Sequence, residues 1–473
     1  MSDYPKEECG VVGISTNVDA SRLAFFALYA IQHRGQESAG LATYNEKIHI
    51  KTGMGLISQA LQESDIETLH GSYSIGHTRY STTGSTNIEN AQPIRCMVEN
   101  TEIALSHNGN VINAKQIRDE LKEWGCEFIT SSDSEVILQL LANAPGKEWE
   151  EKINYMMNRL QGAYSLTVLT DSGVLGIRDP LGVRPLCLGK IDNGYILASE
   201  SCAIDHIGGE YIRELDPGEA VLITKNEYKT IYKKENKKIA ACVFENIYFA
   251  RPDSILDDQL VYLTRKKMGA QLAIEHPVDA DLVIGVPDSA TAAAVGYSEQ
   301  SGITFTEGLV KNRYVGRTFI LPNQKLRDLG VRRKLNPLKE IINGKSIIVV
   351  DDSIVRGTTT PFVVDLLRKA GAKKIHLRIC APPIKWPCHF GVDMATKNEL
   401  LAANKSIEDI QNFVKADSLG YLSIEGLMQS VPKPKNKYCD ACFTGNYPVP
   451  IQLELTKLVL ENGSRRSNRQ EAT

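Results

Sequence analysis

Two neighbouring acids follow a short apolar run that is typical of a buried strand. The segment 347–360 reads IIVVDDSIVRGTTT, and Asp351 and Asp352 stand directly after its apolar residues. A turn with a glycine and three threonines comes next, and Thr360 and Pro361 are expected to be the N-cap and N1 positions of a helix. Backbone N–H groups, hydroxyls and a helix N-terminus bind phosphate, while paired carboxylates bind sugar hydroxyls or hold magnesium through water. An ordinary capped turn does not explain the paired acids, so we favour a binding function.

A second turn fits the same kind of ligand. Residues 283–287 end another predicted strand, and Asp288, Ser289 and Ala290 open the helix after it. Its free N–H groups are expected at the same edge of the sheet, although many strand-to-helix turns look alike. Between the two turns, the run 311–334 holds eight basic residues against a single acid. This run is either a solvated basic face or a loop that closes over an anionic substrate.

The strand, the two aspartates and the Thr/Gly-rich turn resemble the type I phosphoribosyltransferases, which bind phosphoribosyl pyrophosphate (PRPP). The resemblance implies that the turn wraps the 5′-phosphate and that Ser289, Asp351 and Asp352 hold one Mg²⁺ per subunit. The PRPP-binding residues that it implies are Asp288, Ser289, Asp351, Asp352, Ser353, Ile354, Val355, Arg356, Gly357 and Thr358, together with the lid cations Lys311, Arg313 and Arg317.

A cysteine near the N-terminus stands at the head of another predicted strand. Cys9 opens the run CGVVGIS, where a half-buried core thiol is the ordinary interpretation. Five polar motifs elsewhere change that interpretation, because charged or amide groups beside glycines are costly in a core unless they bind something. The motifs are QHRGQESAG (32–40), GHTRYSTTG (76–84), SHNGN (106–110), SSDSE (131–135) and RDPLGVRP (178–185).

Together with Cys9, these motifs resemble the N-terminal-nucleophile glutamine amidotransferases, whose fold is a four-layered αββα sandwich. In that family the first residue supplies both the thiol that attacks the glutamine amide and the α-amino group that acts as base. An α-amino group has a pKa of ~7.7–8.0 but no basicity inside a peptide bond, so the resemblance implies that residues 1–8 are a propeptide that is removed. The residues implied for catalysis are Cys9, with Asn108 and Gly109 as oxyanion donors; those implied for glutamine binding are Arg79 for the α-carboxylate, Asp133 for the α-ammonium group, and Arg34.

Three histidines within these motifs invite a different hypothesis, a metal cluster. His33, His77 and His107 are each followed by a motif residue rather than by a second ligand at i+4. We therefore expect them to make structural hydrogen bonds.

Cysteines offer another candidate metal centre. Cys439 and Cys442 form a CxxC pair, which needs two further sulfurs from elsewhere. Cys242 and Cys388 match positions of an Fe–S-containing branch of the glutamine PRPP amidotransferases, and four thiolates suffice for a [4Fe–4S] cluster. Cys380 is a rival ligand that is better explained as a core residue, and zinc in a Cys₄ site is the competing metal. The remaining thiols, Cys96, Cys126, Cys187 and Cys202, are interpreted as ordinary.

Two stretches with different patterns must position these residues. Up to about residue 235, short apolar runs and amphipathic segments indicate sheets with helices packed outside them, an α+β arrangement. Beyond the lysine-rich segment 225–238, strands alternate with helices, which predicts a parallel, doubly wound α/β sheet. The predicted strands are 10–14, 103–106, 163–169, 194–198, 281–286, 346–350 and 374–380, and the predicted helices are 21–32, 113–124, 134–144, 148–160, 259–275, 290–299 and 361–370. We place the propeptide at 1–8, a glutamine amidotransferase domain at 9–235, a phosphoribosyltransferase domain with the cluster cysteines at 236–445, and an extension with a frayed end at 446–473.

The composition is that of an ordinary globular protein. The 473 residues are 42% hydrophobic and 23% charged, with a net charge of −3, which excludes wholesale disorder, collagen-like repetition and a membrane protein. Near-neutrality gives no general reason to expect nucleic acid or a membrane as a partner. The short acidic N-terminus resembles neither a signal peptide nor a transit peptide, so we expect the cytoplasm.

The two sets of motifs are unrelated, and their presence in one chain over about 9–445 resembles the glutamine PRPP amidotransferases. That family converts glutamine, PRPP and water into 5-phosphoribosylamine, pyrophosphate and glutamate, the step that commits PRPP to purine synthesis. The resemblance implies a homotetramer, inhibition by purine nucleotides and an interdomain passage for ammonia. Two alternatives stay open. Another N-terminal-nucleophile amidotransferase gives no reason for Asp351 and Asp352, and a non-catalytic PRPP-sensing regulator needs neither Cys9 nor a cleaved leader.

Overall fold

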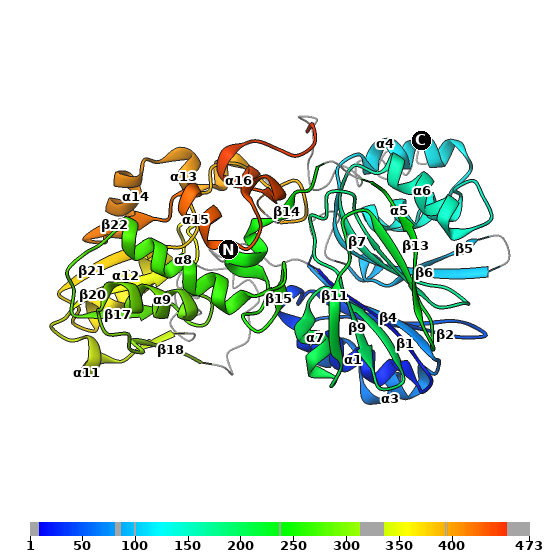
Figure 1. The fold of residues 1–473 in the computed structure, drawn as a ribbon, viewed down its shortest axis with the longest axis horizontal. Coiled ribbons are helices and arrows are strands. Elements are labelled where there is room, and N and C mark those ends of the chain that lie inside the picture. Colours follow the sequence, from blue (N-terminus) through cyan, green and yellow to red (C-terminus); the bar gives the residue numbers. More distant parts are fainter. Residues whose placement is uncertain are drawn as a thin grey trace, which may run out of the picture.

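The computed structural model describes residues 9–80, 87–98, 101–235, 238–312, 335–392, 394 and 396–451. Figure 1 shows two bodies side by side, the first formed by the N-terminal half of the chain and the second by most of the remainder. None of the helices in these ranges combines the length and the apolar character that a membrane crossing needs.

Two stacked antiparallel sheets form the first body. Within the described residues, the strand order is β11-β9-β10-β1-β4-β2-β3 in one sheet and β13-β12-β8-β7-β6-β5 in the other. The first sheet comprises β1 (Gly10–Thr16), β2 (Ser38–Asn45), β3 (Lys47–Met54), β4 (Tyr73–Arg79), β9 (Cys187–Ile191), β10 (Gly194–Ala198) and β11 (Glu210–Glu214). The second comprises β5 (Ile94–Val98), β6 (Thr101–Val111), β7 (Gly162–Leu169), β8 (Val174–Arg178), β12 (Glu219–Ile223) and β13 (Tyr228–Lys233).

Helices cover the outer face of each sheet, which completes the four layers. The helices on the first sheet are α1 (Ala20–Ala30), α2 (Ile57–Ala60), α3 (Glu63–Thr68) and α7 (Ser201–His206), and those on the second are α4 (Ala114–Glu123), α5 (Asp133–Ala142) and α6 (Trp149–Arg159). Strand β1 shows why the sequence folds this way: Val11 packs between the sheets, while Val12 and Ile14 pack under the helices. Because both faces of the strand are buried, its sequence is a continuous apolar run. The predicted αββα sandwich is confirmed.

The second body is built on a parallel sheet with the order β17-β20-β21-β22 in the described residues. Its main elements are α8 (Val261–Glu275), β17 (Leu282–Gly285), α9 (Thr291–Ser301), β20 (Ser346–Asp351), α12 (Thr360–Lys369), β21 (Lys374–Ile379), α14 (Ile407–Val414), β22 (Ser418–Tyr421) and α15 (Ile424–Ser430). After α9 the chain passes to one side of β17, where Phe305 bridges Val283 in parallel, and it returns as β20 on the other side. The direction of winding therefore reverses between β17 and β20, which is the point where open α/β sheets bind their ligands. The predicted doubly wound sheet is confirmed.

Short elements join the two bodies. Strand β14 (Ala241–Cys242) pairs in parallel with β23 (Tyr438–Cys439), and the π-helical turn η3 (Glu245–Phe249) follows β14. Smaller elements of the second half are β15 (Ile255–Leu256), β16 (Gln259–Leu260), β18 (Leu309–Lys311), β19 (Leu335–Pro337), α11 (Lys339–Ile342), α13 (Leu401–Asn404) and α16 (Ala441–Thr444).

One local expectation needs correction. Helix α12 begins one residue earlier than predicted, because Thr359 is its N-cap and Thr360 is already helical.

The lysine-rich segment 225–238 contains an edge strand, since 228–233 forms β13 at the edge of the second sheet. Lysines on an edge strand discourage pairing with another chain, which gives a reason for the composition of this segment. The domain boundary after residue 235 stays a prediction.

Candidate active sites

Cys9 lies immediately before β1 and is almost fully buried. Its thiol donates to the carbonyl oxygen of Tyr80 at 3.3 Å. Burial raises the pKa of the thiol to about 11, although the Tyr80 hydrogen bond and the charge of Arg79 act in the opposite direction. At neutral pH the thiol is therefore protonated, and attack on a carbonyl requires a base at its side.

Charged groups from two other elements converge on this cysteine. Arg79 ends β4 and Asp133 opens α5, and both are buried. Both side chains, together with Glu37, act electrostatically on the Cys9 thiol. An Asp133 oxygen accepts the Val111 N–H at 3.0 Å, which fixes its carboxylate beside β6. A guanidinium and a carboxylate held apart beside a thiol form a pair that can bind the two charges of an α-amino acid.

Strand β6, whose Val111 N–H binds Asp133, also carries a buried amide side chain. Asn108 is 1% exposed, and within the described part of the chain neither its side-chain nitrogen nor its side-chain oxygen has a hydrogen-bond partner. Burying such a group costs free energy unless a ligand or water completes it. Gly109 follows with φ of +147°, a conformation that a side chain rarely adopts. The Asn108 amide is therefore available to form hydrogen bonds with a bound ligand.

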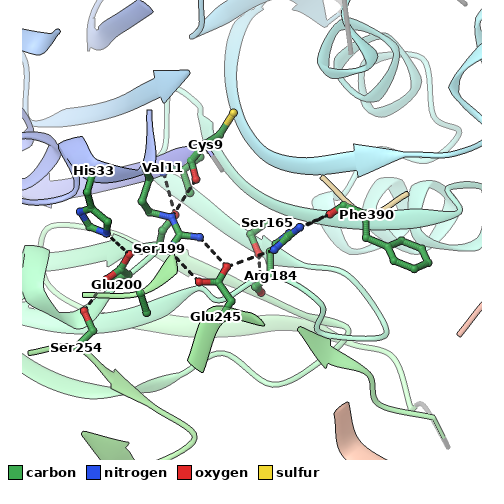
Figure 2. A network of polar contacts seen from close by, with 12 residues as sticks. Cys9, Val11, His33, Ser165, Arg184, Ser199, Glu200, Glu245, Ser254 and Phe390 are labelled. Carbon is green, nitrogen blue, oxygen red and sulfur yellow. Dashed lines mark hydrogen bonds and ion pairs between the residues drawn. The ribbon is translucent and has the colours of Figure 1, made fainter. Parts of the chain in front are cut away.

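Arg34, which the resemblance assigned to glutamine binding, lies underneath the nucleophile. Its Nε donates to the carbonyl oxygen of Cys9 at 3.1 Å, and its terminal nitrogens contact Glu200 at 2.6 Å and Glu245 at 2.7 Å. Figure 2 shows the contact of His33 with Glu200 and that of Arg184 with Glu245. Although burial acts to raise the pKa of Glu200, the charges of His33 and Arg34 hold it well below its usual range. The printed contacts of this guanidinium are all with protein groups, and the glutamine-binding role that the resemblance implies stays a prediction.

The three motif histidines make structural hydrogen bonds, as predicted. His33 contacts Glu200 at 2.7 Å, His77 contacts the His107 carbonyl at 3.0 Å, and His107 contacts the Ser134 hydroxyl at 3.1 Å. Burial lowers the pKa of His77 to about 3, so this residue is neutral at physiological pH. Because His77 is on β4 and His107 is on β6, their contact ties the two sheets together beside Arg79 and Asn108.

In the second body, the two predicted phosphate turns meet at the switch point of the sheet. Gly285 of β17 is paired with Val350 of β20, so the turns after these strands leave the same edge side by side. The Ser289 hydroxyl donates to Asp352 at 2.6 Å and connects the two turns directly. Asp351 and Asp352 are buried at the carboxyl end of β20. Polar groups of both turns lie beside them there.

The rest of the turn 353–358 contributes mainly backbone. Ile354 and Val355 are buried in the apolar core, so only their main-chain groups can reach a ligand. Arg356 contacts Glu399 at 2.9 Å. Gly357 has φ of +71°, and a Cβ there would meet the Leu401 side chain at 2.6 Å. The neighbouring members Ser353 and Thr358 complete the turn, and the Ser353 hydroxyl donates to Asp352 at 2.5 Å.

The predicted lid is only partly described. Lys311 ends β18, and its ammonium group contacts the exposed carboxylate of Asp288 at 2.7 Å. Arg313 and Arg317 lie outside the described residues, as do the propeptide 1–8 and residues 81–84 of the GHTRYSTTG motif.

The four cysteines predicted as cluster ligands gather at the seam between the bodies. Cys242 stands opposite Cys439 in the β14–β23 pair, and Cys442 follows on α16. Burial, and then the neighbouring Cys242, Cys439 and Cys388, raise the pKa of the Cys442 thiol well above its usual range. Cys380 ends its strand among core residues near Asp351 and Asp352, away from this group.

The four thiols at the seam are the ligand type and number that either a [4Fe–4S] cluster or a Cys₄ zinc ion requires. The Cys442 thiol lies within electrostatic reach of Cys242, Cys439 and Cys388, beside the apolar core of the second body. In the ranges that the structure describes, no three His, Cys, Asp or Glu side chains are already placed to hold a metal ion.

Sequence reasoning missed several residues of the site. Glu200 and Glu245 are single acids outside the motifs, and Glu37 stands in the motif 32–40 without an assigned role. They reach Arg79 or Arg34 only through the fold. Glu245 is 211 positions away from Arg34 along the chain. The only available signal was that an arginine in a glycine-rich motif needs a buried partner somewhere.

Known proteins resemble this chain over nearly its whole length. A family model described as a glutamine amidotransferase domain matches residues 77–206. An amidophosphoribosyltransferase of Archaeoglobus fulgidus is 49% identical, covering 94% of this chain and 98% of its own length, and one of Synechocystis sp. is 48% identical, covering 98% and 95%. The solved glutamine PRPP amidotransferase from B. subtilis, complexed with ADP and GMP, matches with a TM-score of 0.89 at 41% identity, covering 95% of this chain and 99% of that one.

Proposed function

The chain belongs to the amidophosphoribosyltransferase family, and from that premise we propose how its residues divide the reaction between two sites. The reaction uses glutamine, PRPP and water, gives 5-phosphoribosylamine, pyrophosphate and glutamate, and is the first step of purine biosynthesis. The observation that carries the proposal is that Arg79 and Asp133 both act on the buried Cys9 thiol, while the buried Asn108 amide has no hydrogen-bond partner among the described residues.

In the glutaminase site, Cys9 is the nucleophile. Arg79 binds the α-carboxylate of glutamine and Asp133 its α-ammonium group, which places the side-chain amide at the thiol. Asn108 and Gly109 then donate to the tetrahedral oxyanion, and one such donor contributes about 2.7–4 kcal/mol to the barrier difference. Removal of residues 1–8 frees the α-amino group of Cys9, which takes the proton that the thiol holds until then.

In the transferase site, the paired turns bind PRPP. The turn 353–358 wraps the 5′-phosphate through main-chain N–H groups, Asp351 and Asp352 bind the ribose hydroxyls, and the turn at Asp288 and Ser289 faces the pyrophosphate. Lys311, Arg313 and Arg317 neutralise the phosphates. Ser289, Asp351 and Asp352 would hold one Mg²⁺, which supplies positive charge to the departing pyrophosphate.

At the seam, Cys242, Cys388, Cys439 and Cys442 hold a [4Fe–4S] cluster. Its role is structural or oxygen-sensing, since its ligands come from both ends of the transferase half. We place the domains at 9–235 and 236–445, with the extension 446–473 after them and an interdomain passage for ammonia between the two sites.

Assembly, regulation and location complete the proposal. A relative of known structure is complexed with ADP and GMP, which supports inhibition of this enzyme by purine nucleotides. A homotetramer in the cytoplasm is what the family resemblance implies.

Glutamine hydrolysis on protein whose N-terminus has been read by mass spectrometry tests the proposal. Protein beginning at Cys9 should hydrolyse glutamine, and PRPP should stimulate the reaction. A Cys9→Ala variant should lose glutamine-dependent synthesis while keeping synthesis from ammonia. Full activity of protein that still begins at Met1 would contradict the role of the α-amino group, and hydrolysis indifferent to PRPP would contradict the coupling of the sites.

The cluster has a test of its own. Cys439→Ser should remove iron, inorganic sulfide and the visible absorbance of the purified protein, whereas Cys380→Ser should keep all three. Zinc bound in a ratio of one per chain, with neither iron nor sulfide, would replace the cluster with a Cys₄ zinc site.

A further inference from the structure

A glycine of the second half touches the backbone of the glutaminase site. Gly391 stands three positions after Cys388, and a Cβ built on it would lie 3.1 Å from the carbonyl carbon and 3.2 Å from the Cα of Gly109. These atoms are all main chain, so no side-chain rotation can relieve the contact. Gly391 also has φ of +106°, which side chains rarely adopt. The absence of a side chain at 391 is what allows the two backbones to approach.

Two further contacts fasten this segment to the first half. The Asn110 side chain on β6 donates to the carbonyl oxygen of His389 at 3.0 Å. Arg184, which is fully buried, donates to the carbonyl oxygen of Phe390 through Nε at 3.0 Å and through a terminal nitrogen at 2.7 Å. The segment 389–391 is therefore held at each of its three residues by groups of the first body.

The same arginine connects the segment to the nucleophile. Arg184 contacts Glu245 at 3.4 Å, Glu245 contacts Arg34 at 2.7 Å, and Arg34 donates to the Cys9 carbonyl at 3.1 Å (Figure 2). The acid that both arginines share belongs to η3, which comes after β14 in the chain. Segment 389–391 thus contacts β6 directly, and it is connected to Cys9 through Arg184, Glu245 and Arg34.

We infer that segment 389–391 is a positioning element of the glutaminase site, and that it sets the place of the Gly109 backbone through Gly391. This inference rests on the proposed role of Asn108 and Gly109 as oxyanion donors. Oxyanion donors act on the transition state rather than on bound substrate, and small displacements of such groups cost rate. Segment 389–391 belongs to the half of the chain that consumes the ammonia. The glutaminase half is therefore incomplete by itself.

The central experiment is Gly391→Ala in the full chain, with glutamine-dependent and ammonia-dependent synthesis measured side by side. The added methyl group should displace Gly109 and lower kcat for glutamine hydrolysis about tenfold or more, with KM for glutamine within about twofold. Synthesis from ammonia bypasses Cys9 and should stay within about twofold. Asn110→Ala, which removes the hydrogen bond to His389, should change the same quantities in the same direction.

Gly302→Ala is the matched control. Gly302 has φ of +74° at the end of α9, and a Cβ there would meet nothing within 4 Å. It therefore introduces similar backbone strain without a contact, and it should leave glutamine hydrolysis close to that of the parent. Thermal melting of both variants shows whether either change simply unfolds the protein.

A binding measurement separates positioning from general damage. An aldehyde analogue of glutamine forms a tetrahedral adduct with the thiol and uses the oxyanion donors, whereas the product glutamate does not. Gly391→Ala should weaken the aldehyde about as much as it lowers kcat, and it should leave the affinity for glutamate unchanged.

Three outcomes are decisive. Equal loss of glutamine-dependent and ammonia-dependent synthesis in Gly391→Ala would overturn the inference, because the change would then be structural. Unchanged glutamine hydrolysis in both Gly391→Ala and Asn110→Ala would also overturn it. Asn108→Ala distinguishes this failure from that of the proposed function: full glutamine hydrolysis in Asn108→Ala would refute the oxyanion assignment itself, whereas its loss there with no effect at Gly391 would refute only the positioning element.

Discussion

The two sites of this molecule are prepared for their substrates in different ways. Around Cys9, the functional groups come from separate elements of a closed sandwich, and Arg79, Asp133 and Asn108 are all at most 3% exposed. At the switch point, the functional groups come from two turns, and they satisfy one another: Ser289 contacts Asp352, and Lys311 contacts Asp288. On the proposed assignments, the first site holds its polar groups in place before glutamine arrives. The second has contacts that its substrate must exchange for its own.

The difference teaches where specificity and adaptability reside. A buried and preorganised site loses little freedom when it binds, so each misplaced group costs rate directly. A site made of turns at a sheet edge can rearrange, which suits a large anionic substrate that needs metal and a closing loop. The glutaminase site should therefore respond strongly to changes in its buried support, and the transferase site to changes in its charge.

The largest expected effect is on the buried support. Glu245→Gln leaves Arg34 and Arg184 without the full charge that they share, and removing one partner of a buried ion pair costs about 3–5 kcal/mol of unfolding free energy. Urea unfolding measures the change. Glu299→Gln is the control, since Glu299 contacts Lys266 on the exposed surface and should change little. Equal stability of the two variants would mean that the buried network contributes no more than a surface pair.

The next effect sharpens the contrast at the transferase site. Asp352→Asn removes a carboxylate that can bind metal or ribose, and loss of a group of this kind typically costs about 10–100-fold. Synthesis from ammonia and from glutamine should fall together, while glutamine hydrolysis without PRPP should not change. Asp365→Asn, at an exposed position of α12, is the matched control. A selective loss of the glutamine-dependent reaction in Asp352→Asn would contradict the assignment of Asp352 to the transferase site.

The effect that is smallest near neutral pH, and that grows on acidification down to about pH 3, concerns the protonation of His77. His77 is neutral in the folded protein because burial lowers its pKa to about 3, whereas an unfolded histidine binds a proton below about 6.5. The unfolded state thus binds more protons as the pH falls, and stability declines below pH ~6.5 by about 1.4 kcal/mol per pH unit. His77→Gln keeps an N–H donor without titrating, so it should lessen this decline.

Circular dichroism during acid titration checks that prediction, with His70→Gln at an exposed position as the control. Glutamine hydrolysis should also fail at a higher pH than synthesis from ammonia, because His77 supports the sheets of only the first body. The same acid midpoint in His77→Gln and the parent chain would refute the assignment.

Helices and strands could be predicted from the sequence better than the contacts between them. Apolar runs at 163–169 and 346–350 and the helix over 134–144 were recognisable because their periodicity is local. The order of strands within each sheet was not predictable, since it depends on pairings far apart in the chain. Strand β22 was missed altogether, because its four residues are too short for a pattern.

Dependence on contacts between distant parts of the chain also decides which site residues could be predicted. Asp351, Asp352, Asn108 and Gly109 stand in motifs whose chemistry is visible from neighbouring residues. Arg34 stands in such a motif too, yet its partners are a carbonyl at position 9 and acids at 200 and 245. The approach of Gly391 to Gly109 has no local signature, because it depends only on the shape of two distant backbones.

The parallel pairing of β14 with β23 also bears on biosynthesis. Its two strands are separated by almost the whole transferase half, so the ribosome must make residues up to at least 439 before the pair can form. The sandwich is complete in sequence much earlier. However, the positioning segment 389–391 is translated only later, with residue 391. A nascent chain would thus release ammonia slowly until most of the part that captures it has been translated.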